Sequence, residues 1–303
     1  MELRHIRYFL AVADEKNFTR AAARLGIAQP PLSLQIKDLE SEIGAQLFHR
    51  LPYGAELTEA GHAFLEAVRA MPDQAVEATR AAQRAARGET GRLRLGFTGT
   101  AALNPIVPAA VRAFRQDFPD AELTLEEANS IALTAGLTNG NLDVAILRPS
   151  ASDPPELRKY VLDRELLVAA LPASHPAVAV GASVTLSSLA AMPLILTPRS
   201  IGVSLHDAAI DACRASGFEP VIGQSAPQIA SILSLVAAGL GFSLVPASIT
   251  QLSLFGVSFL SLTGKQPSID LAVAHIKTRP PQSALNFTGL ARGIKVNGRS
   301  GVA

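Results

Sequence analysis

Cysteine is almost absent from this sequence, because its 303 residues include only Cys213. A single cysteine cannot form a disulfide within the chain. The first residues also lack the basic start and the long apolar stretch of a secretory signal. Both absences predict a protein of the reducing cytoplasm.

Apolar segments that could cross a membrane are missing as well. The most membrane-like segment, residues 226–249, has no charged residue, but it contains two prolines, a Gly-Leu-Gly turn and four serines. The glycines would interrupt a spanning helix, and serines inside the segment would place polar groups in lipid. We interpret the segment as a buried helix, a turn and a buried strand, and we expect no membrane partner.

A surplus of positive charge, which would predict a polyanion partner, is lacking. The formal net charge is +1 at pH 7, and residues 1–60 carry seven Lys and Arg against eight Asp and Glu. Any argument for nucleic-acid binding must therefore rest on pattern and not on bulk charge. With 48% hydrophobic and 17% charged residues the chain is globular, and its length suits two or three domains.

Catalytic and cofactor motifs are also missing. The six histidines show no metal-ligand spacing, and no Ser or Cys lies in a nucleophile elbow. The stretch "GLGFSLVP" follows a helix pattern and precedes a strand pattern, which is the reverse of the dinucleotide-binding order. Cys213 lies on an amphipathic helical pattern and suits the core. We predict no enzyme, no metal site and no cofactor.

Three short helical patterns occupy the start of the chain. The first stops before Asp14, and its apolar stripe consists of Leu3, Ile6, Phe9, Leu10 and Val12. The second carries three alanines, can be capped by Asn17 or Thr19, and ends at Gly26, a suitable residue for a left-handed helix end. A tight turn follows, so the second and third patterns together predict a helix-turn-helix.

The third helix opens with two prolines, in the stretch "QPPLSLQIKDLE" that begins at Gln29. Proline is tolerated in a first helical turn, because the missing N–H would have no intrahelical partner there and the φ angle is already near helical. This helix ends at Gly44, and its inward side is predicted to consist of Leu32, Ile36, Leu39 and Ile43.

The outer side of the third helix has the chemistry to bind DNA. The second helix of a helix-turn-helix presents its N-terminal residues to base edges, where Gln and Ser can hydrogen-bond and Pro or Leu can touch a thymine methyl. Nearby hydroxyl and basic groups can contact phosphates. A merely solvated face is the alternative. The candidate DNA-binding residues are Thr19, Gln29, Pro30, Pro31, Ser33, Leu34, Lys37 and Arg50.

A short hairpin, or wing, is predicted after the third helix, and Thr58 is expected to cap a long helix from about Glu59 to Arg87. Apolar residues recur along this helix at alternating steps of four and three, as in a coiled-coil seam. They are Phe64, Val68, Met71, Ala75, Ala78, Ala82 and Ala85. A helix packed on its own domain is the alternative, since Pro72 should kink it. No neighbouring segment offers a partner stripe, which favours a dimerisation helix.

Strands and helices alternate from about residue 91, which predicts a mainly parallel sheet covered by helices. Residues 133–150 and 233–248 share the order helix, glycine, apolar strand, proline and serine. This repeated order of elements predicts two Rossmann-like subdomains, the first over about 91–161 and 266–293 and the second over about 162–265. Residues 294–303 are expected to be a frayed tail.

Three strand-to-helix junctions in this part of the chain are rich in hydroxyl and small residues. Ligands of doubly wound folds bind there, beyond the carboxyl ends of strands. Each junction alone is more often a helix cap, but three in equivalent positions favour a carboxylate site. Arg148 follows a strand directly and is either a carboxylate ligand or a solvated loop arginine. The candidate effector-binding residues are Thr98, Gly99, Thr100, Asn129, Ser130, Arg148, Pro198, Arg199, Ser200, Ser204, Gln224 and Pro246. Gln224 and Pro246 are expected to line the far wall of the cleft.

The stretch "FTRAAARLGIAQPPLSLQIKDLESEIGAQLFHR", followed by "LTEAGHAFL", resembles the N-terminal domain of LysR-type transcriptional regulators. The likeness is specific over residues 1–65 and looser beyond. It implies a winged helix-turn-helix domain over 1–58, a dimerising linker helix over 59–88, and an effector-binding domain over 89–303 that resembles periplasmic binding proteins. It also implies a homotetramer, with double-stranded promoter DNA, a small-molecule effector and RNA polymerase as partners.

Two residues depart from the pattern of that family. Leu34 stands where arginine is frequent, and Glu56 stands in the wing where a basic or apolar residue is common. Later stretches such as "LRPSASDPPELRKYVL" look most like regulators of aromatic-compound catabolism, whose effectors include muconates and related acids.

The fold class we expect is therefore α/β, with an all-α winged helix-turn-helix domain at the N-terminus. The function we expect is a sequence-specific DNA-binding regulator that responds to a small organic acid, aromatic or muconate-like. The alternative is a small-molecule-binding protein or an α/β enzyme without a DNA role.

Overall fold

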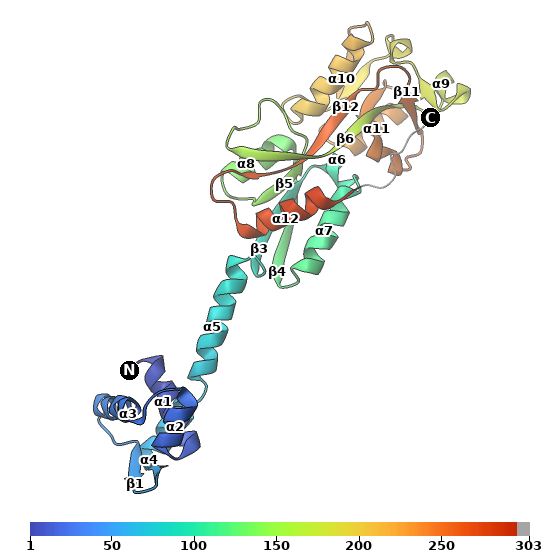
Figure 1. Cartoon of the computed structure of the whole chain (residues 1–303). Helices are drawn as coiled ribbons and strands as arrows, with labels where there is room; N and C mark the ends of the chain where they lie inside the picture. Colours follow the sequence, from blue (N-terminus) through green and yellow to red (C-terminus); the bar gives the residue numbers. More distant parts are fainter. Residues whose placement is uncertain (296–303) are drawn as a thin grey trace. The chain divides into compact units, whose positions relative to one another are not determined.

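The computed structural model describes residues 1–295 and divides into two compact units, the first from Met1 to Arg84 and the second from Ala85 onward (Figure 1). Most of the predicted tail, residues 296–303, lies outside the described residues. No helix among residues 1–295 is long and apolar enough to cross a membrane.

The first unit is a three-helix cluster followed by a hairpin and a further helix. Its elements are α1 (Leu3–Glu15), α2 (Phe18–Leu25), α3 (Gln29–Ile43), β1 (Phe48–Leu51), β2 (Gly54–Leu57) and α4 (Glu59–Val68). The Asn17 side chain caps α2 by accepting from the N–H of Arg20 at 3.0 Å, and Gly26 and Gly44 end α2 and α3 in the left-handed conformation. The helix-turn-helix prediction is therefore confirmed.

Two details of the helices differ from expectation. Helix α1 continues past Asp14 to Glu15, because its hydrogen bonds run on to the left-handed Lys16 after the apolar stripe has ended. In α3, Leu32, Ile36 and Leu39 are fully buried, but Ile43 is 39% exposed. Ile43 lies in the last turn, where its neighbours in the chain are exposed as well, so the inward stripe ends one turn earlier than predicted.

The predicted wing is present as the antiparallel hairpin of β1 and β2, in which Phe48 pairs with Leu57 and Leu51 with Gly54. The N–H of Ala55 donates to the carbonyl of Lys16 at 2.8 Å. A side chain at Gly54 would bring a Cβ to 3.0 Å from the same carbonyl. The wing is therefore fixed to the end of α1 through close backbone contact.

The prediction of one helix from Glu59 to Arg87 is wrong, because the chain forms α4 and then α5 (Met71–Ala86) with a break at residues 69–70. Pro72 lies in the first turn of α5, where its missing N–H breaks no helical bond. Phe64, Val68 and Met71 belong to the core of the first unit, as the packed-helix alternative expected. None of the sixteen residues of α5 is buried.

The second unit consists of two α/β halves joined by long strands. The first half contains β3 (Gly91–Phe97), α6 (Gly99–Ala102), α7 (Ile106–Asp117), β4 (Ala121–Glu127), α8 (Ser130–Thr138), β5 (Val144–Leu147) and α12 (Gln282–Gly293). The second half contains α9 (Pro176–Val180), β7 (Ser183–Val184), η1 (Leu186–Leu189), β8 (Leu194–Leu196), α10 (Val203–Ala215), β9 (Ile222–Ser225), α11 (Ile229–Ala237), β10 (Ser243–Pro246), η2 (Ala247–Gln251) and β11 (Val257–Leu262). Strands β6 (Leu157–Pro172) and β12 (Ser268–Ile276) connect them.

The sheets are mixed, so the prediction of mainly parallel pairing holds only within each half. Strand β3 pairs parallel with β4 and β5, and β8 pairs parallel with β9. Strands β6 and β12, however, pair antiparallel with each other and lie at the passage between the halves (Figure 1). The sequence pattern showed only the apolar end of the sixteen-residue β6, because its first part is polar and partly exposed.

Each half of the second unit has its own apolar core. Leu93, Phe114 and Phe287 lie in the core of the first half, and Leu171 and Phe242 in that of the second. Cys213 is fully buried in the second core, as predicted. Burial raises the pKa of its thiol to about 11, with Glu219 adding to the effect, so the thiol is protonated and unreactive. Helix α12 and strand β11 were not predicted.

Candidate functional site

The outward face of α3 presents most of the candidate DNA-binding residues to solvent. Gln29, Pro30, Pro31 and Lys37 are exposed, Leu34 is 57% exposed, and Ser33 is half-buried. Thr19 is exposed in the first turn of α2, where Asn17 and not Thr19 is the cap. These side chains are therefore accessible to solvent to different degrees, whereas Leu32 and Ile36 lie on the buried side of α3.

Arg50 connects the wing to this face. Its Nη1 donates to Ser33 Oγ at 2.6 Å, and its guanidinium carbon lies 5.0 Å from the centre of the Phe18 ring. The side chain is exposed. Arg50 therefore positions Ser33 on α3 from the wing, a contact that the sequence did not predict.

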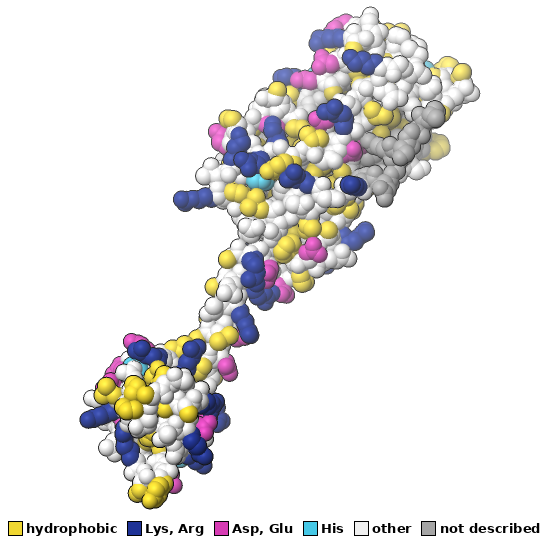
Figure 2. Space-filling model, in the orientation of Figure 1, with side chains coloured by type: hydrophobic (Ala, Val, Ile, Leu, Met, Phe, Trp, Pro, Cys, Tyr) yellow, Lys and Arg dark blue, Asp and Glu magenta, His cyan; other side chains and the backbone are white. Residues whose placement is uncertain are grey.

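Charges of both signs surround the first unit. Figure 2 shows Lys and Arg side chains with acidic side chains between them on the visible face, and an apolar group at the tip of the wing. In that tip Tyr53 is 96% exposed and Leu51 is 46% exposed. The structure thus agrees with the near-neutral charge of residues 1–60.

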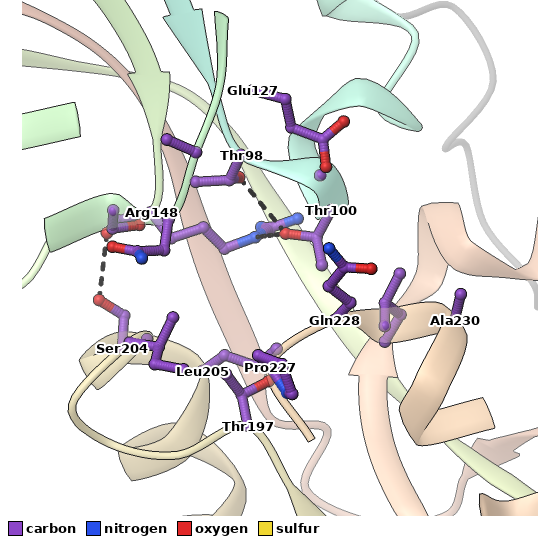
Figure 3. Close-up of a pocket in the computed structure, with 17 residues that line it drawn as sticks. Thr98, Thr100, Glu127, Arg148, Thr197, Ser204, Leu205, Pro227, Gln228 and Ala230 are labelled. Carbon is purple, nitrogen blue, oxygen red and sulfur yellow. Dashed lines mark hydrogen bonds between the residues drawn. The ribbon is translucent and has the colours of Figure 1, made fainter. Parts of the chain in front are cut away.

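A cavity of about 390 Å³ lies between the two halves of the second unit (Figure 3). Seven candidate effector-binding residues line it: Thr98, Gly99, Thr100, Asn129, Ser130, Arg148 and Ser204. Its other lining residues, which the sequence did not single out, are Glu127, Ala128, Thr197, Ile201, Gly202, Leu205, Pro227, Gln228, Ile229 and Ala230. The volume is that of a small-molecule site.

Three candidates in the loop after β8 lie outside the cavity. The N–H groups of Ile201 and Gly202 both donate to the carbonyl of Pro198, and this turn brings Ile201 and Gly202 to the cavity in place of Pro198, Arg199 and Ser200. Arg199 instead pairs with Asp207 at 2.8 Å on the surface, where it holds the pKa of Asp207 below its ordinary value.

The two residues expected in the far wall, Gln224 and Pro246, also lie elsewhere. Gln224 is exposed on β9, and Pro246 is buried in β10 opposite Leu167 of β6. The far wall is formed instead by Pro227 to Ala230, at the start of α11. A clue was present in the sequence, since this stretch is a fourth strand-to-helix junction of the kind already used for three others.

Arg148 is buried, so it is not the solvated loop residue that was the alternative. Its side chain is 4% exposed, Nη2 donates to Glu165 Oε2 at 2.8 Å, and Nε donates to Thr100 Oγ1 at 3.2 Å. These contacts hold the guanidinium at the cavity wall (Figure 3). A fixed guanidinium of this kind suits recognition of a carboxylate.

Glu165 is the fully buried partner of Arg148 and was missed from the sequence. Its Oε1 accepts from the N–H of Ser248 at 2.7 Å, and Asn104 Nδ2 lies 3.4 Å from Oε2. Burial alone would raise the pKa of Glu165, but the charge of Arg148 and the hydrogen bonds with Ser248 and Arg148 lower it below its ordinary value. The pair is therefore ionised at neutral pH. No local motif in the sequence marks Glu165, since Asp163 and Arg164 stand beside it before the apolar run.

Helix starts from both halves meet at the cavity. Asn129 caps α8 by accepting from the N–H of Ala132 at 2.9 Å, whereas α10 and α11 begin without a side-chain cap. Their first-turn residues line the cavity, among them Ser204 and Ile229. Uncapped N–H groups and the positive ends of helix dipoles favour an anionic ligand.

Ser204 also joins the two halves directly. Its Oγ donates to the carbonyl of Pro149 at 2.7 Å and lies 3.2 Å from the carbonyl of Arg148. Ser204 belongs to α10 of the second half, whereas both carbonyls follow β5 of the first half. The start of α10 is therefore hydrogen-bonded to the backbone of Arg148, whose guanidinium is the positive charge in the cavity wall.

Comparison with known families gives two matches that together cover most of the chain. Residues 3–62 match the model described as "Bacterial regulatory helix-turn-helix protein, lysR family", and residues 86–290 match the model described as "LysR substrate binding domain". The first match includes the wing and α3, and the second includes every residue that lines the cavity.

Individual relatives match over nearly their whole length. The uncharacterized HTH-type transcriptional regulator YnfL of Escherichia coli (strain K12) is 41% identical over 254 residues, which are 84% of this chain and 85% of YnfL. The crystal structure of CbnR, a LysR family transcriptional regulator, has a TM-score of 0.78 at 31% identity and covers 96% of this chain and 100% of CbnR. Full-length CbnR complexed with its target DNA matches with the same TM-score at 30% identity, covering 96% of this chain and 99% of that one.

Proposed function

The chain belongs to the LysR family of transcriptional regulators, and from that membership we propose that it is a cytoplasmic regulator of promoter DNA whose effector is a small organic acid. Its matched regions make it a DNA-binding transcriptional regulator with an effector-binding domain, and not an enzyme. This membership excludes the alternative of a binding protein or enzyme without a DNA role.

DNA is bound in this proposal through the outward face of α3. Gln29, Ser33 and Leu34 meet base edges and thymine methyls, together with Pro30 and Pro31, while Thr19 and Lys37 contact phosphates. Arg50 donates to Ser33 Oγ, which leaves the hydroxyl proton of Ser33 free to be donated to a base. Arg50 is exposed beside Ser33, so it can touch a phosphate and position Ser33 at once. The solvent-facing placement of these side chains supports the proposal.

The effector lies in the cavity of the second unit in this proposal, and the buried guanidinium of Arg148 is the observation that carries it. The carboxylate of the acid is held by Arg148, by the Thr100 hydroxyl and by the uncapped starts of α10 and α11. Apolar residues such as Ile201 and Leu205 contact its body. An aromatic or muconate-like acid is the class favoured by the sequence resemblance.

Ligand binding is transmitted by closure of the two halves around the acid. A ligand shifts a conformational equilibrium only if it binds one arrangement more tightly than the other. The Ser204 bond to the carbonyls of Arg148 and Pro149 already links the halves at the cavity, so it is the first contact that closure would strengthen or break.

The active form is a homodimer, assembled further into a homotetramer, in this proposal. Helix α5 carries the remainder of the alanine seam, namely Ala75, Ala78, Ala82 and Ala85, and no residue of α5 is buried within the chain. Pairing of this helix with that of a second copy would cover the seam. RNA polymerase is a further partner in this proposal.

The effector proposal is tested by calorimetry on the full-length protein with benzoate and cis,cis-muconate. At least one acid should bind, and Thr100→Val, which keeps the shape of the side chain but loses the Arg148 contact, should weaken that binding about tenfold. Arg148→Ala should abolish it. A gel shift with the flanking promoter DNA should be unchanged for Thr100→Val in the absence of acid. Equal affinity of the wild type and both variants for the acid would place the effector site elsewhere.

A further inference from the structure

Two charged residues line the cavity, Arg148 and Glu127. The positive charge of Arg148 is balanced by Glu165, whose carboxylate is fully buried 2.8 Å away. Among residues 1–295 the Glu127 carboxylate is in no hydrogen bond or ion pair. These three charges together therefore leave the cavity with one negative charge that no protein group balances, which is an unexpected property in a site for a simple anion.

The strand register shows how the two charges are placed. Glu127 ends β4 opposite Phe97 of β3, and Phe97 lies opposite Ile146 of β5, two residues before Arg148. Glu127 and Arg148 therefore lie at the ends of the strands on either side of β3, roughly 12 Å apart at the backbone, with Thr98 between the two strands. Figure 3 shows the two side chains on opposite sides of Thr98. A small molecule in the cavity can meet both charges at once.

Gly99 leaves the space in which the Glu127 carboxylate lies. A Cβ at Gly99 would come within 2.6 Å of Glu127 Oε1, so any side chain there would displace the carboxylate. The position of the carboxylate over the first residue of α6 also allows a purely structural role, in which it stabilises that short helix. The experiment below separates the two roles, because only a ligand-binding role affects which ligand is preferred.

A cationic group on the ligand would balance Glu127. Glu127 is exposed at the end of β4, so its attraction for a cation is that of an exposed ion pair, modest in size and reduced by salt. A plain carboxylate, or a dianion, would instead be repelled by Glu127 after the charge of Arg148 has been shared with Glu165. The protein groups thus form a positive end and a negative end within one cavity.

We propose that the effector is an amino acid, or another small acid with a protonated amine, whose carboxylate lies at Arg148 and Thr100 and whose ammonium lies at Glu127. This inference rests on the proposed function, since it keeps an organic acid in the same cavity and adds the amine. It narrows the effector class from carboxylic acids in general to zwitterions, and it replaces the muconate-like dianion that the sequence resemblance favours.

The test is a thermal-shift screen of the full-length protein followed by calorimetry on the tightest ligand. The probes are the L-amino acids found in proteins and para-(aminomethyl)benzoate, each with its deaminated acid and its decarboxylated amine, for example L-phenylalanine, hydrocinnamate and phenethylamine. The tightest ligand should carry both groups, and its deaminated acid should bind about threefold more weakly, the loss of one exposed ion pair.

The variant Glu127→Gln should remove the preference for the amine, whereas the matched variant Glu126→Gln, which makes the same charge change outside the cavity, should retain it. A deaminated acid that binds wild type as tightly as its amino acid would overturn the inference and leave the acid-effector proposal standing. A Glu127→Gln protein that melts at a lower temperature yet keeps the preference would also overturn it, in favour of the structural role. If no acid binds, with or without an amine, the acid-effector proposal itself is wrong.

Discussion

The second unit has a buried ion pair in addition to exposed ones, whereas the ion pairs described for the first unit lie at its surface. On the surface of the first unit, charged side chains are exposed and intermixed, and the exposed Arg50 contacts the half-buried Ser33 of α3. In the second unit, Arg148 and Glu165 form an ion pair that is almost completely buried. Exposed contacts contribute little to folding and remain available to a partner, whereas a buried pair is coupled to the fold. Substitutions should therefore affect binding in the first unit and both stability and binding in the second.

The largest effect is expected from Glu165→Gln. It leaves the buried guanidinium of Arg148 without its counter-charge, so the free energy of unfolding of the second unit should fall by about 3–5 kcal/mol. Urea denaturation followed by circular dichroism measures it. The matched control is Glu219→Gln, which removes the acid of the exposed pair with Arg214 and should lower the unfolding free energy only slightly. Equal losses of unfolding free energy in both variants would contradict the claim that the buried pair contributes more to stability than an exposed one.

Lowering the pH should reduce the stability of Glu165→Gln less than that of the wild type. The folded-state pKa of Glu165 lies below its ordinary value of 4.5, so its ionised form contributes fully above that pH, and the contribution is lost as the pH falls through the folded-state pKa. Glu165→Gln has no such group to titrate. Its stability should therefore fall less than that of the wild type when the pH is lowered below about 4, as measured by urea midpoints across a pH series.

An intermediate effect, confined to binding, is expected from Arg50→Ala. Without the donor from the wing, Ser33 loses its fixed orientation, and affinity for the specific site should fall about tenfold while the melting temperature of the protein is unchanged. Gel-shift titration across a salt series compares this variant with Lys37→Ala, which should weaken specific and non-specific binding alike and reduce the salt slope by about one. Ser33→Ala should resemble Arg50→Ala in specific binding. If Ser33→Ala binds the specific site like the wild type, α3 does not bind bases through Ser33.

The smallest effect is expected from Ser204→Ala. The variant loses one partly buried hydroxyl contact between the halves, worth about 1 kcal/mol, and should change effector affinity by less than tenfold in calorimetry. Ser187→Ala, a change to an exposed serine outside the cavity, is the control and should leave that affinity unchanged. A complete loss of effector binding in Ser204→Ala would show that the hydroxyl contacts the ligand itself and does not merely join the halves.

The two regions also differ in how much of them the sequence predicted. In the first unit, caps and periodicity located α2, α3 and the wing, since Asn17, Gly26 and Gly44 act through neighbouring residues. The break before Pro72 was misjudged because α4 packs into the core of the first unit, and only tertiary contacts show that. The contact between Arg50 and Ser33 was missed for the same reason, since it joins residues 17 positions apart.

In the second unit, the junctions at Thr98, Asn129 and Ser204 were located correctly at the cavity, because each follows a strand and begins a helix. The loop from Pro198 to Ser200 was not, since its turn presents the next two residues instead. Glu165 and Glu127 carry no local motif at all. Each becomes notable only through what the fold places beside it, an arginine 17 residues earlier in one case and Gly99 in the other.

The sequence alone determined the helix-turn-helix, the α/β alternation and the family, because these depend on residues a few positions apart. The tertiary structure decided which junctions share one cavity, that Arg148 is buried and paired, and that Glu127 is left as the uncompensated charge. The physical reason is that electrostatic environment depends on burial and on distance in space, and both are set only when strands and helices from distant parts of the chain have packed.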